Sequence, residues 1–568
     1  MDERKKKAIS IGEEDFKRII DKNGYLVDKT LLIKELLDST AKVTLFTRPR
    51  RFGKTLNQSM LQRFFDDERT AEGTVVDNRY LFEGLNIMEC GEEYLQHQQR
   101  YPVIKLSLKS AKQPDFKEAY LKLREEIADE FRRHKYVLNG TCLDEDQKKL
   151  IQKLMERQGE YGEYNSSVKF LSSCLKAFHK REVIILIDEY DVPLETAYYS
   201  GFYDEMVSFI RSLFESALKG NDSLNFAVVT GCLKINRESI FTGLNHLDAV
   251  SVTTPRYNEA FGFTEEEVKE ILSYYDRSEK FGQVKDWYDG YLFGGKEIYN
   301  PWSILKFMQD STASPAHEPQ AYWVNTSSNQ IVRDLVDHAT SAVRREIEIL
   351  MSGGTIEKVI DENITYGNLH QSEDNLWSML YFTGYLKDCG RSQQNPDAVK
   401  LCIPNREVAG VYKTVITSWF DEKIRNENLD TLQRALEEGD CPAITEIISN
   451  LLLETISYYD YSENYYHGFL TGLLTKMGKY TLTSNREAGT GRADLLMREE
   501  RLYGRAMILE LKVADDVRKM EGKCEEALRQ IESQDYDTEL AKDGCQPILK
   551  YGICFYKKGC LVKKAESK

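Results

Sequence analysis

The sequence contains no long hydrophobic run. Its longest uninterrupted aliphatic stretch covers only residues 183–187, whereas a transmembrane helix needs about 20 residues. No bilayer crossing is therefore expected. The first residues carry a basic cluster, but they lack the apolar segment that follows such a cluster in a secretory signal. We therefore expect a cytoplasmic protein.

Paired cysteines and excess positive charge are also lacking. The 11 cysteines are scattered and odd in number, and no two of them stand in a C-x-x-C arrangement. This pattern predicts reduced thiols, with neither a disulfide framework nor a zinc site. The net charge of −15 gives no overall attraction to nucleic acid or to an anionic membrane.

What remains is typical of a large globular chain of 568 residues, with 41% hydrophobic and 30% charged residues, long enough for about four domains. Short Val/Ile/Leu-rich runs alternate with segments of helical periodicity, which indicates an α/β fold with a parallel sheet covered on both faces. The expected strands are 43–47, 103–107, 183–188 and 226–230, and the expected helices include 54–65, 115–133 and 203–218.

The rest of the chain suggests two further regions. Residues from 264 onward are mostly of helical pattern, and the segment 376–404 is interpreted as a helix plus β-wing of winged-helix type. From about residue 460 the pattern predicts helix, three strands, helix and strand. The predicted domains are thus 1–263, 264–455 and 456–568.

A phosphate-binding loop is predicted between the first strand and its helix. In this context backbone N–H groups and the helix N-terminus converge on an anion, the lysine reaches the β- and γ-phosphates, and the threonine hydroxyl binds Mg²⁺. The usual first glycine is replaced by arginine, the next residue is a proline without an N–H group, and the three arginines offer direct phosphate contacts. The alternative is an ordinary surface turn. The expected nucleotide-binding residues are Arg48, Pro49, Arg50, Arg51, Phe52, Gly53, Lys54 and Thr55.

Two adjacent acids follow the apolar strand at 183–187. Asp188 is expected to hold Mg²⁺ and Glu189 to orient or deprotonate the attacking water. Thr230, at the end of the next strand, is a candidate sensor of the γ-phosphate, and Arg237 is a candidate arginine finger. The alternative for Asp188 and Glu189 is a pair of ordinary solvated acids at a strand end. For Thr230 it is a plain strand end, and for Arg237 it is a solvated arginine on a helix face.

A second constellation lies near the carboxyl end. Glu510 and Lys512 stand two residues apart on an expected strand, so their side chains share one face. Asp494, on the neighbouring strand or turn, is expected to meet Glu510 and bind a divalent cation, with Lys512 polarising a water for phosphodiester hydrolysis. Glu463 and Gln530 are expected to assist from two helices. An exposed Glu/Lys pair that serves solubility is the alternative.

Taken together, these motifs resemble an AAA-ATPase-like family of bacterial proteins with a C-terminal domain of the PD-(D/E)xK nuclease superfamily. The residues that carry the resemblance are Tyr25-Leu-Val-Asp-Lys-Thr30, the loop 48–55, Ile187-Asp-Glu-Tyr-Asp191, Phe261-Gly-Phe-Thr264 and Ile403-Pro-Asn405. The resemblance implies a P-loop NTPase core, a helical and winged-helix-like middle and a restriction-endonuclease-like αβββαβ tail. It maps the nuclease acids and lysine onto Asp494, Glu510 and Lys512, with Glu463 and Gln530 as the helix acid and glutamine; Ala493 stands where the motif proline would be.

The function that we expect is ATP binding and hydrolysis coupled to Mg²⁺- or Mn²⁺-dependent cleavage of DNA. Nucleic acid and a second copy of the chain are the expected partners, and no membrane is involved. Two alternatives remain open. One is an ATP-gated scaffold whose C-terminal fold only binds nucleic acid or protein, and the other is a signalling ATPase with a protein partner.

Overall fold

The computed structural model describes most of the chain. The described residues are 6–234, 240–241, 247–323, 329–392, 395–426, 429–454, 463–484, 494–499, 501, 503–533 and 540–565. They form two compact units: residues 1–331 with 355–411, and residues 332–354 with 412–568. Among the described residues, no helix is long and apolar enough to span a bilayer.

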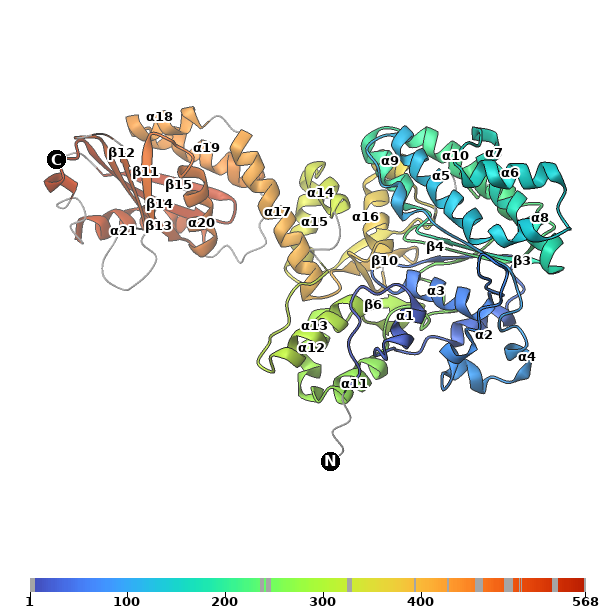
Figure 1. Ribbon diagram of the computed structural model, residues 1–568. Helices are drawn as coiled ribbons and strands as arrows, with labels where there is room; N and C mark the ends of the chain where they lie inside the picture. Colours follow the sequence, from blue (N-terminus) through green and yellow to red (C-terminus); the bar gives the residue numbers. More distant parts are fainter. Residues whose placement is uncertain are drawn as a thin grey trace. The chain divides into compact units, whose positions relative to one another are not determined.

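A five-stranded parallel sheet forms the core of the first unit (Figure 1). Its strand order is β2-β3-β4-β1-β5. Every residue of β1 and β3 is buried, as expected for a parallel sheet covered on both faces, and the four predicted strands are confirmed. The bounds are β1 (Val43–Thr47), β2 (Val103–Ser107), β3 (Val183–Asp188), β4 (Leu224–Gly231) and β5 (Leu247–Val250).

Helices cover both faces of this sheet. Figure 1 shows α5, α8 and α10 on one side and α1, α2 and α3 on the other. The predicted helices are confirmed as α3 (Lys54–Phe65), α5 (Phe116–Arg133) and α10 (Tyr203–Leu218). The others here are α1 (Phe16–Asp21), α2 (Leu31–Asp38), α4 (Glu92–Leu95), α6 (Glu145–Met155), α7 (Tyr161–Asn165), α8 (Ser167–His179) and α9 (Val192–Ser200).

The remainder of the first unit contains a helical cluster and a small antiparallel sheet. Helices α11 (Glu265–Tyr274), α12 (Phe281–Tyr288) and α13 (Pro301–Ala313) share one hydrophobic cluster, beside the hairpin β6 (Tyr291–Phe293) and β7 (Lys296–Ile298). Helix α16 (Glu373–Phe382) accompanies a three-stranded sheet of order β8-β10-β9. Its strands are β8 (Ile356–Val359), β9 (Lys387–Arg391) and β10 (Ala398–Cys402).

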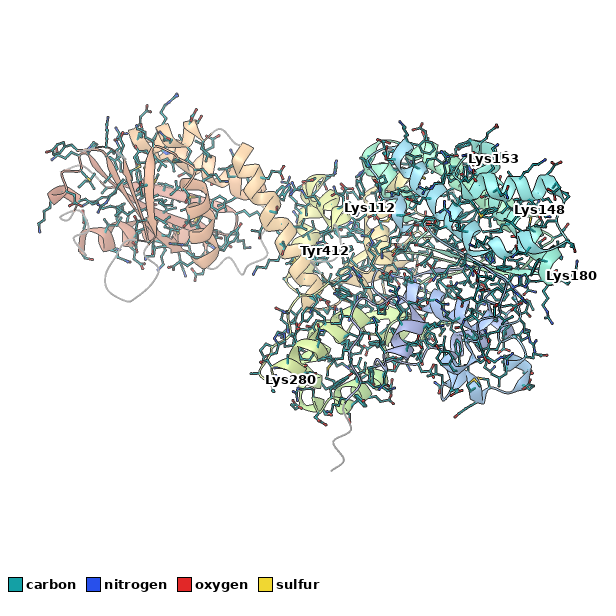
Figure 2. All side chains as sticks on the ribbon, in the orientation of Figure 1. Lys112, Lys148, Lys153, Lys180, Lys280 and Tyr412 are labelled. Carbon is teal, nitrogen blue, oxygen red and sulfur yellow. A yellow bond between two sulfur atoms is a disulfide. The ribbon has the colours of Figure 1, made fainter. Side chains whose placement is uncertain are left out.

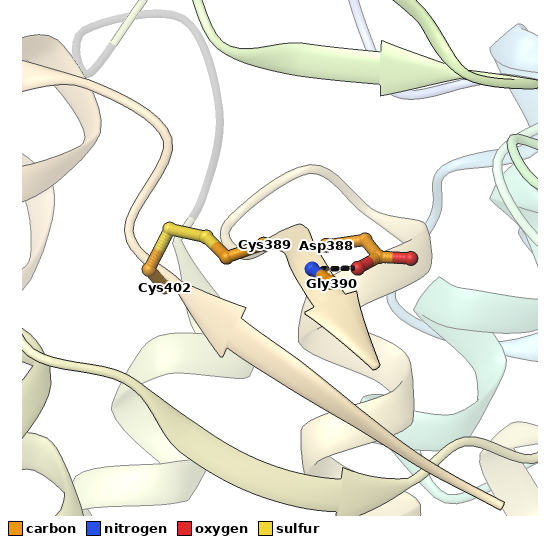
Figure 3. Close-up of a disulfide and its surroundings, with 4 residues drawn as sticks. All are labelled: Asp388, Cys389, Gly390 and Cys402. Atoms are coloured by element: carbon orange, nitrogen blue, oxygen red, sulfur yellow. Dashed lines mark hydrogen bonds between the residues drawn. A yellow bond between two sulfur atoms is a disulfide. The ribbon is translucent and has the colours of Figure 1, made fainter. Parts of the chain in front are cut away.

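The expectation of uniformly reduced thiols is wrong for one pair. Cys389 of β9 and Cys402 of β10 form a disulfide (Figure 3). The two strands are antiparallel neighbours, and this pairing brings together two cysteines that lie 13 residues apart in the sequence. Sequence spacing alone could not show that pairing. The other described cysteines are free.

The second unit is built on a mixed five-stranded sheet of order β11-β12-β13-β14-β15. Neighbouring strands are antiparallel except β13 and β14, which are parallel. The helix, three strands, helix and strand predicted for this region are found in that order. The elements are α20 (Glu463–Leu474), β11 (Tyr480–Ser484), β12 (Leu495–Glu499), β13 (Ala506–Val513), α21 (Met520–Ser533), β14 (Ile548–Tyr556) and the additional edge strand β15 (Gly559–Lys564).

Helices α15 (Ser341–Met351), α18 (Asp430–Glu438) and α19 (Cys441–Glu454) complete this unit. Helices α14 (Gln330–Asp337) and α17 (Arg406–Asn426) each contain residues of both units. Helices α18, α19 and α20 share one large hydrophobic cluster with the sheet, which includes Met507, Leu509 and Leu511. The residues between these on β13 therefore face the other side of the sheet.

Candidate functional sites

The predicted phosphate loop connects β1 to α3. Gly53 precedes the first residue of α3 and adopts φ +82°, a left-handed conformation that favours glycine. The turn therefore presents the first N–H groups of a 12-residue helix, which are not bonded within the helix, to the space in front of the loop. This is the geometry that an anion-binding loop needs.

Lys54 is the first residue of α3 and is only 6% exposed. Its Nζ donates hydrogen bonds to the carbonyl oxygens of Arg48 and Pro49, each 2.8 Å away. The same nitrogen lies 3.7 Å from Sγ of Cys232, just beyond the end of β4. The lysine is thus held against the loop, on the side where β4 ends.

A cavity of about 340 Å³ opens in front of the loop. The residues that line it include the polar and charged Lys54, Thr55 and Glu189 and the aromatic Tyr25 and Trp302. Motifs far apart in the sequence build this lining. Gly262 approaches so closely that its N–H donates to the carbonyl of Phe52 at 3.1 Å, and an added Cβ there would lie 2.9 Å from the Phe52 ring.

The predicted acid pair lies at the carboxyl end of β3. Asp188 is buried, and its Oδ1 accepts a hydrogen bond from the hydroxyl of Thr230 on the neighbouring strand β4. Glu189 lines the cavity with φ +52°. Burial and the nearby charge of Asp188 raise the pKa of Glu189, and Lys54 and Lys109 partly oppose that increase. The structure therefore brings Asp188, Glu189 and Thr230 together as the sequence led us to expect.

Asp191 has a structural role that sequence reasoning missed. Its Oδ2 accepts hydrogen bonds from the backbone N–H groups of Cys232 (2.7 Å) and Leu233 (3.2 Å). It therefore fixes the loop after β3 to the end of β4. Its position three residues after Asp188 was the available signal, but a contact across two strands cannot be seen in sequence.

The three arginines of the loop occupy different environments. Arg48 is fully buried behind the loop, where its guanidinium donates to the carbonyls of Thr47 and Val250 at 2.9 and 3.0 Å. Burial lowers the pKa of Arg48 to about 9. The expected direct phosphate contact of Arg48 is therefore not the role that this structure gives it; Arg48 supports the loop from behind.

Arg50 and Arg51 do line the cavity. Arg50 forms an ion pair with Glu195 of α9, a cavity residue that sequence reasoning did not identify. The guanidinium of Arg51 lies 4.3 Å from the ring of Trp302 in a cation–π contact. Arg237, the candidate arginine finger, lies outside the described residues.

The second constellation is assembled on β13 and at the start of β12. Leu495 pairs with Leu509, which places Asp494 beside Glu510. The backbone N–H of Asp494 donates to Oε2 of Glu510 at 3.4 Å, and Oδ2 of Asp494 accepts from the N–H of Leu511 at 2.9 Å. Lys512 Nζ lies 3.2 Å from Oε1 of Glu510. The predicted meeting of these three residues is therefore present.

Glu510 is 1% exposed. Burial first, and then the charge of Asp494, raise the pKa of Glu510, whereas Lys512 opposes the increase. Two adjoining carboxylates, one of them buried, supply hard oxygen ligands whose mutual repulsion a divalent cation would relieve. The donor set therefore fits Mg²⁺ or Mn²⁺.

The predicted helix residues lie in different positions. Glu463 is exposed in the first turn of α20, one helical turn before His467, whose Nε2 lies 3.2 Å from the carbonyl oxygen of Asp494. Helix α20 thus contacts the backbone at Asp494. Gln530 is half-buried on α21.

Comparison with known proteins finds two family models that each match one part of the chain. Residues 10–241 match a family described as predicted AAA-ATPases, and residues 461–565 match the PD-(D/E)XK nuclease superfamily. A protein of Azotobacter chroococcum mcd 1, described as an uncharacterized protein in the vnfD 5' region, is 28% identical over 338 residues. That match covers 58% of this chain and 56% of the relative, so the chain spans about half of the relative's length. No solved structure matches the chain.

Proposed function

Because residues 10–241 form an AAA-ATPase-like domain and residues 461–565 form a domain of the PD-(D/E)XK nuclease superfamily, we propose that the chain binds and hydrolyses ATP and cleaves DNA in a manner controlled by its nucleotide state. The observation that carries the proposal is that each domain holds its own charged constellation. Lys54 lies with Glu189 in one cavity, and at the other site Glu510 contacts both Asp494 and Lys512. We further propose that the protein acts in the cytoplasm and that it associates with DNA and with further copies of itself.

In the first site, the α3 N-terminus and Lys54 bind the phosphates, and Thr55 and Asp188 hold Mg²⁺. Glu189 faces the cavity, and its raised pKa suits a residue that accepts a proton from the attacking water. Thr230 hydrogen-bonds Asp188 and thereby connects β4 to the metal-binding acid. The remaining loop residues, Pro49 to Gly53, fix the shape of the turn and supply the two cavity-facing arginines.

In the second site, Asp494 and Glu510 hold the cation, and Lys512 orients a water toward the scissile phosphate. A divalent cation, when bound, supplies charge stabilisation for the attacking and leaving oxygens. Lys512 is already placed by its contact with Glu510. We propose that Glu463 of α20 and Gln530 of α21 assist in positioning the cation and the water.

Calorimetric titration of the 568-residue chain tests the two sites against each other. We expect Lys54→Ala to lose ATP binding and retain Mn²⁺ binding, and Glu510→Gln to lose Mn²⁺ binding and retain ATP binding, because the ligands occupy separate domains. Glu438→Gln removes an exposed carboxylate of the second unit and serves as the control, with both ligands bound as in the wild type. A wild-type protein that binds neither ligand would refute the proposal.

A further inference from the structure

We propose that Lys109 enables the cavity to distinguish a nucleoside triphosphate from a diphosphate. In the absence of nucleotide Lys109 forms an ion pair with Glu14, and the terminal phosphate of a triphosphate replaces Glu14 as its partner. This inference rests on the proposed nucleotide-binding function, and it assigns a specificity-determining residue within that site. Three observations support it: the position of Lys109 in the cavity, its ion pair with Glu14, and the comparison with the other ion pair in the cavity lining.

Lys109 lies close to the carboxyl end of β3, where Asp188 and Glu189 are found. Ser107 of β2 pairs with Asp188 of β3, and the N–H of Leu108 donates to the carbonyl of Asp188 at 3.0 Å. Lys109 follows directly, at the start of a short 3₁₀ helix. It lines the cavity together with Lys54, Thr55 and Glu189.

This position corresponds to the end of a bound phosphate chain. The N-terminus of α3 fixes the phosphates at the loop, and Glu189 marks the place where water attacks the last of them. Glu189 and Arg51 are among the charges that act on Lys109. A cation beside Glu189 therefore meets the terminal phosphate of a triphosphate, whereas a diphosphate ends closer to Lys54.

Glu14 is the present partner of Lys109. Oε1 of Glu14 accepts a hydrogen bond from Lys109 Nζ at 2.8 Å. The two residues are 95 positions apart in sequence, so the bond connects the segment before α1 to the end of β2. A carboxylate resembles a phosphate oxygen in charge and hydrogen bonding, so one can replace the other on the same ammonium group.

The exchange is easy because this pair is exposed. Two ion pairs have both partners among the described cavity-lining residues, Lys109–Glu14 and Arg50–Glu195. The side chains of Lys109 and Glu14 are 53% and 47% exposed, against 35% and 19% for Arg50 and Glu195. Exposed pairs contribute little net stability. Lys109 is thus the paired cation that a phosphate can most readily take over.

The test is a binding titration of the 568-residue chain with Mg²⁺ and either ADP or a non-hydrolysable ATP analogue. We expect Lys109→Ala to weaken analogue binding about tenfold and ADP binding less than about twofold. Lys109→Arg should restore discrimination, and Glu14→Gln should tighten analogue binding a few-fold without changing ADP binding. Lys117→Ala, which removes an exposed lysine outside the cavity lining, should match the wild type.

The outcomes separate this inference from the proposed function. Lys109 does not discriminate between the nucleotides if Lys109→Ala changes the two affinities equally or leaves both unchanged. The proposed ATP site is still supported in that case, provided that Lys54→Ala abolishes nucleotide binding. If the wild type binds no nucleotide, the proposed function itself fails. Should Lys109→Ala fold poorly, Glu14→Gln decides: unchanged affinity for the analogue overturns the inference.

Discussion

At the scale of single residues, Arg48 is an unusual residue for a phosphate loop that nevertheless supports the conformation of the loop. It stands where a phosphate loop usually has its first glycine, yet its side chain points behind the loop and is fully buried. Its guanidinium lies 5.0 Å from the ring of Phe293 and 5.5 Å from that of Phe261. The arginine therefore supports the loop by packing and by hydrogen bonds to backbone carbonyls.

Arg48→Gly, which restores the usual glycine, should therefore destabilise the protein. Removal of this side chain leaves a cavity beside Phe261 and Phe293 and takes a hydrogen-bond donor from the carbonyls of Thr47 and Val250, which together costs about 3 kcal/mol of unfolding free energy. Arg51→Ala, which removes only an exposed cation–π contact, should cost about 1 kcal/mol or less. Denaturant unfolding of both variants measures the difference, and an Arg48→Gly variant as stable as the wild type would contradict this role.

The positions of some of these side chains could be predicted from the sequence, and those of others could not. The two-residue period of a strand was enough to place Glu510 and Lys512 on one face, because that period depends only on local geometry. Nothing local distinguishes Arg48 from Arg50 and Arg51. Arg48 is buried because Phe261 and Phe293, more than 200 residues away, pack over it.

At the scale of elements, the start of α17 is fixed by two side chains. Oδ1 of Asn405 accepts from the N–H of Val408 and caps the helix. Glu407, in the first turn, is fully buried and accepts from the hydroxyl of Ser303 at 2.7 Å and from the N–H groups of Tyr322 and Trp323. Ser303 follows the cavity residue Trp302, so α17 begins close to the cavity in front of the loop, and its later residues belong to the second unit.

Glu407 should make stability depend on pH. Burial raises its pKa from 4.5 to about 7, against the opposing effect of its hydrogen bonds. The folded protein therefore binds this proton more tightly than the unfolded chain, so its contribution to stability is greatest below pH 4.5 and declines as pH rises to about 7. The loss is about 3 kcal/mol.

Unfolding free energies measured across this pH range for the wild type and Glu407→Gln check that expectation. The glutamine keeps an acceptor for the two N–H groups and has an N–H to donate to Ser303, but it does not titrate. The difference between the two proteins should change by about 3 kcal/mol over the range. A constant difference would show that the carboxyl group has an ordinary pKa.

The elements themselves were predictable where hydrophobic pattern decides them. Strands β1 and β3 are continuous apolar runs, and α3, α5 and α10 have helical periodicity, so each was found with nearly its true bounds. Strands β5 and β15 were missed. Each contains charged residues and lies at a sheet edge, where pairing with an existing strand, and not hydrophobicity, makes the segment extended.

At the scale of the whole molecule, each compact unit carries a constellation that combines residues distant in sequence. The sequence could identify Lys54, Asp188, Glu189, Asp494, Glu510 and Lys512 as candidates, because each lies within or next to a recognisable strand. It could not predict that Glu14 bonds to Lys109 or that Arg50 bonds to Glu195, since these contacts depend on how the chain folds back on itself. The division into domains at 263 and 455 stays a prediction.

DNA cleavage by the 568-residue chain in Mg²⁺ or Mn²⁺, with and without ATP, measures most directly whether the two constellations work together. We predict that the wild type cleaves DNA at a rate that changes when ATP is added. Asp494→Ala should abolish cleavage under both conditions, and Lys54→Ala should leave a rate that no longer responds to ATP. Equal cleavage by the wild type and both variants, regardless of ATP, would contradict the account.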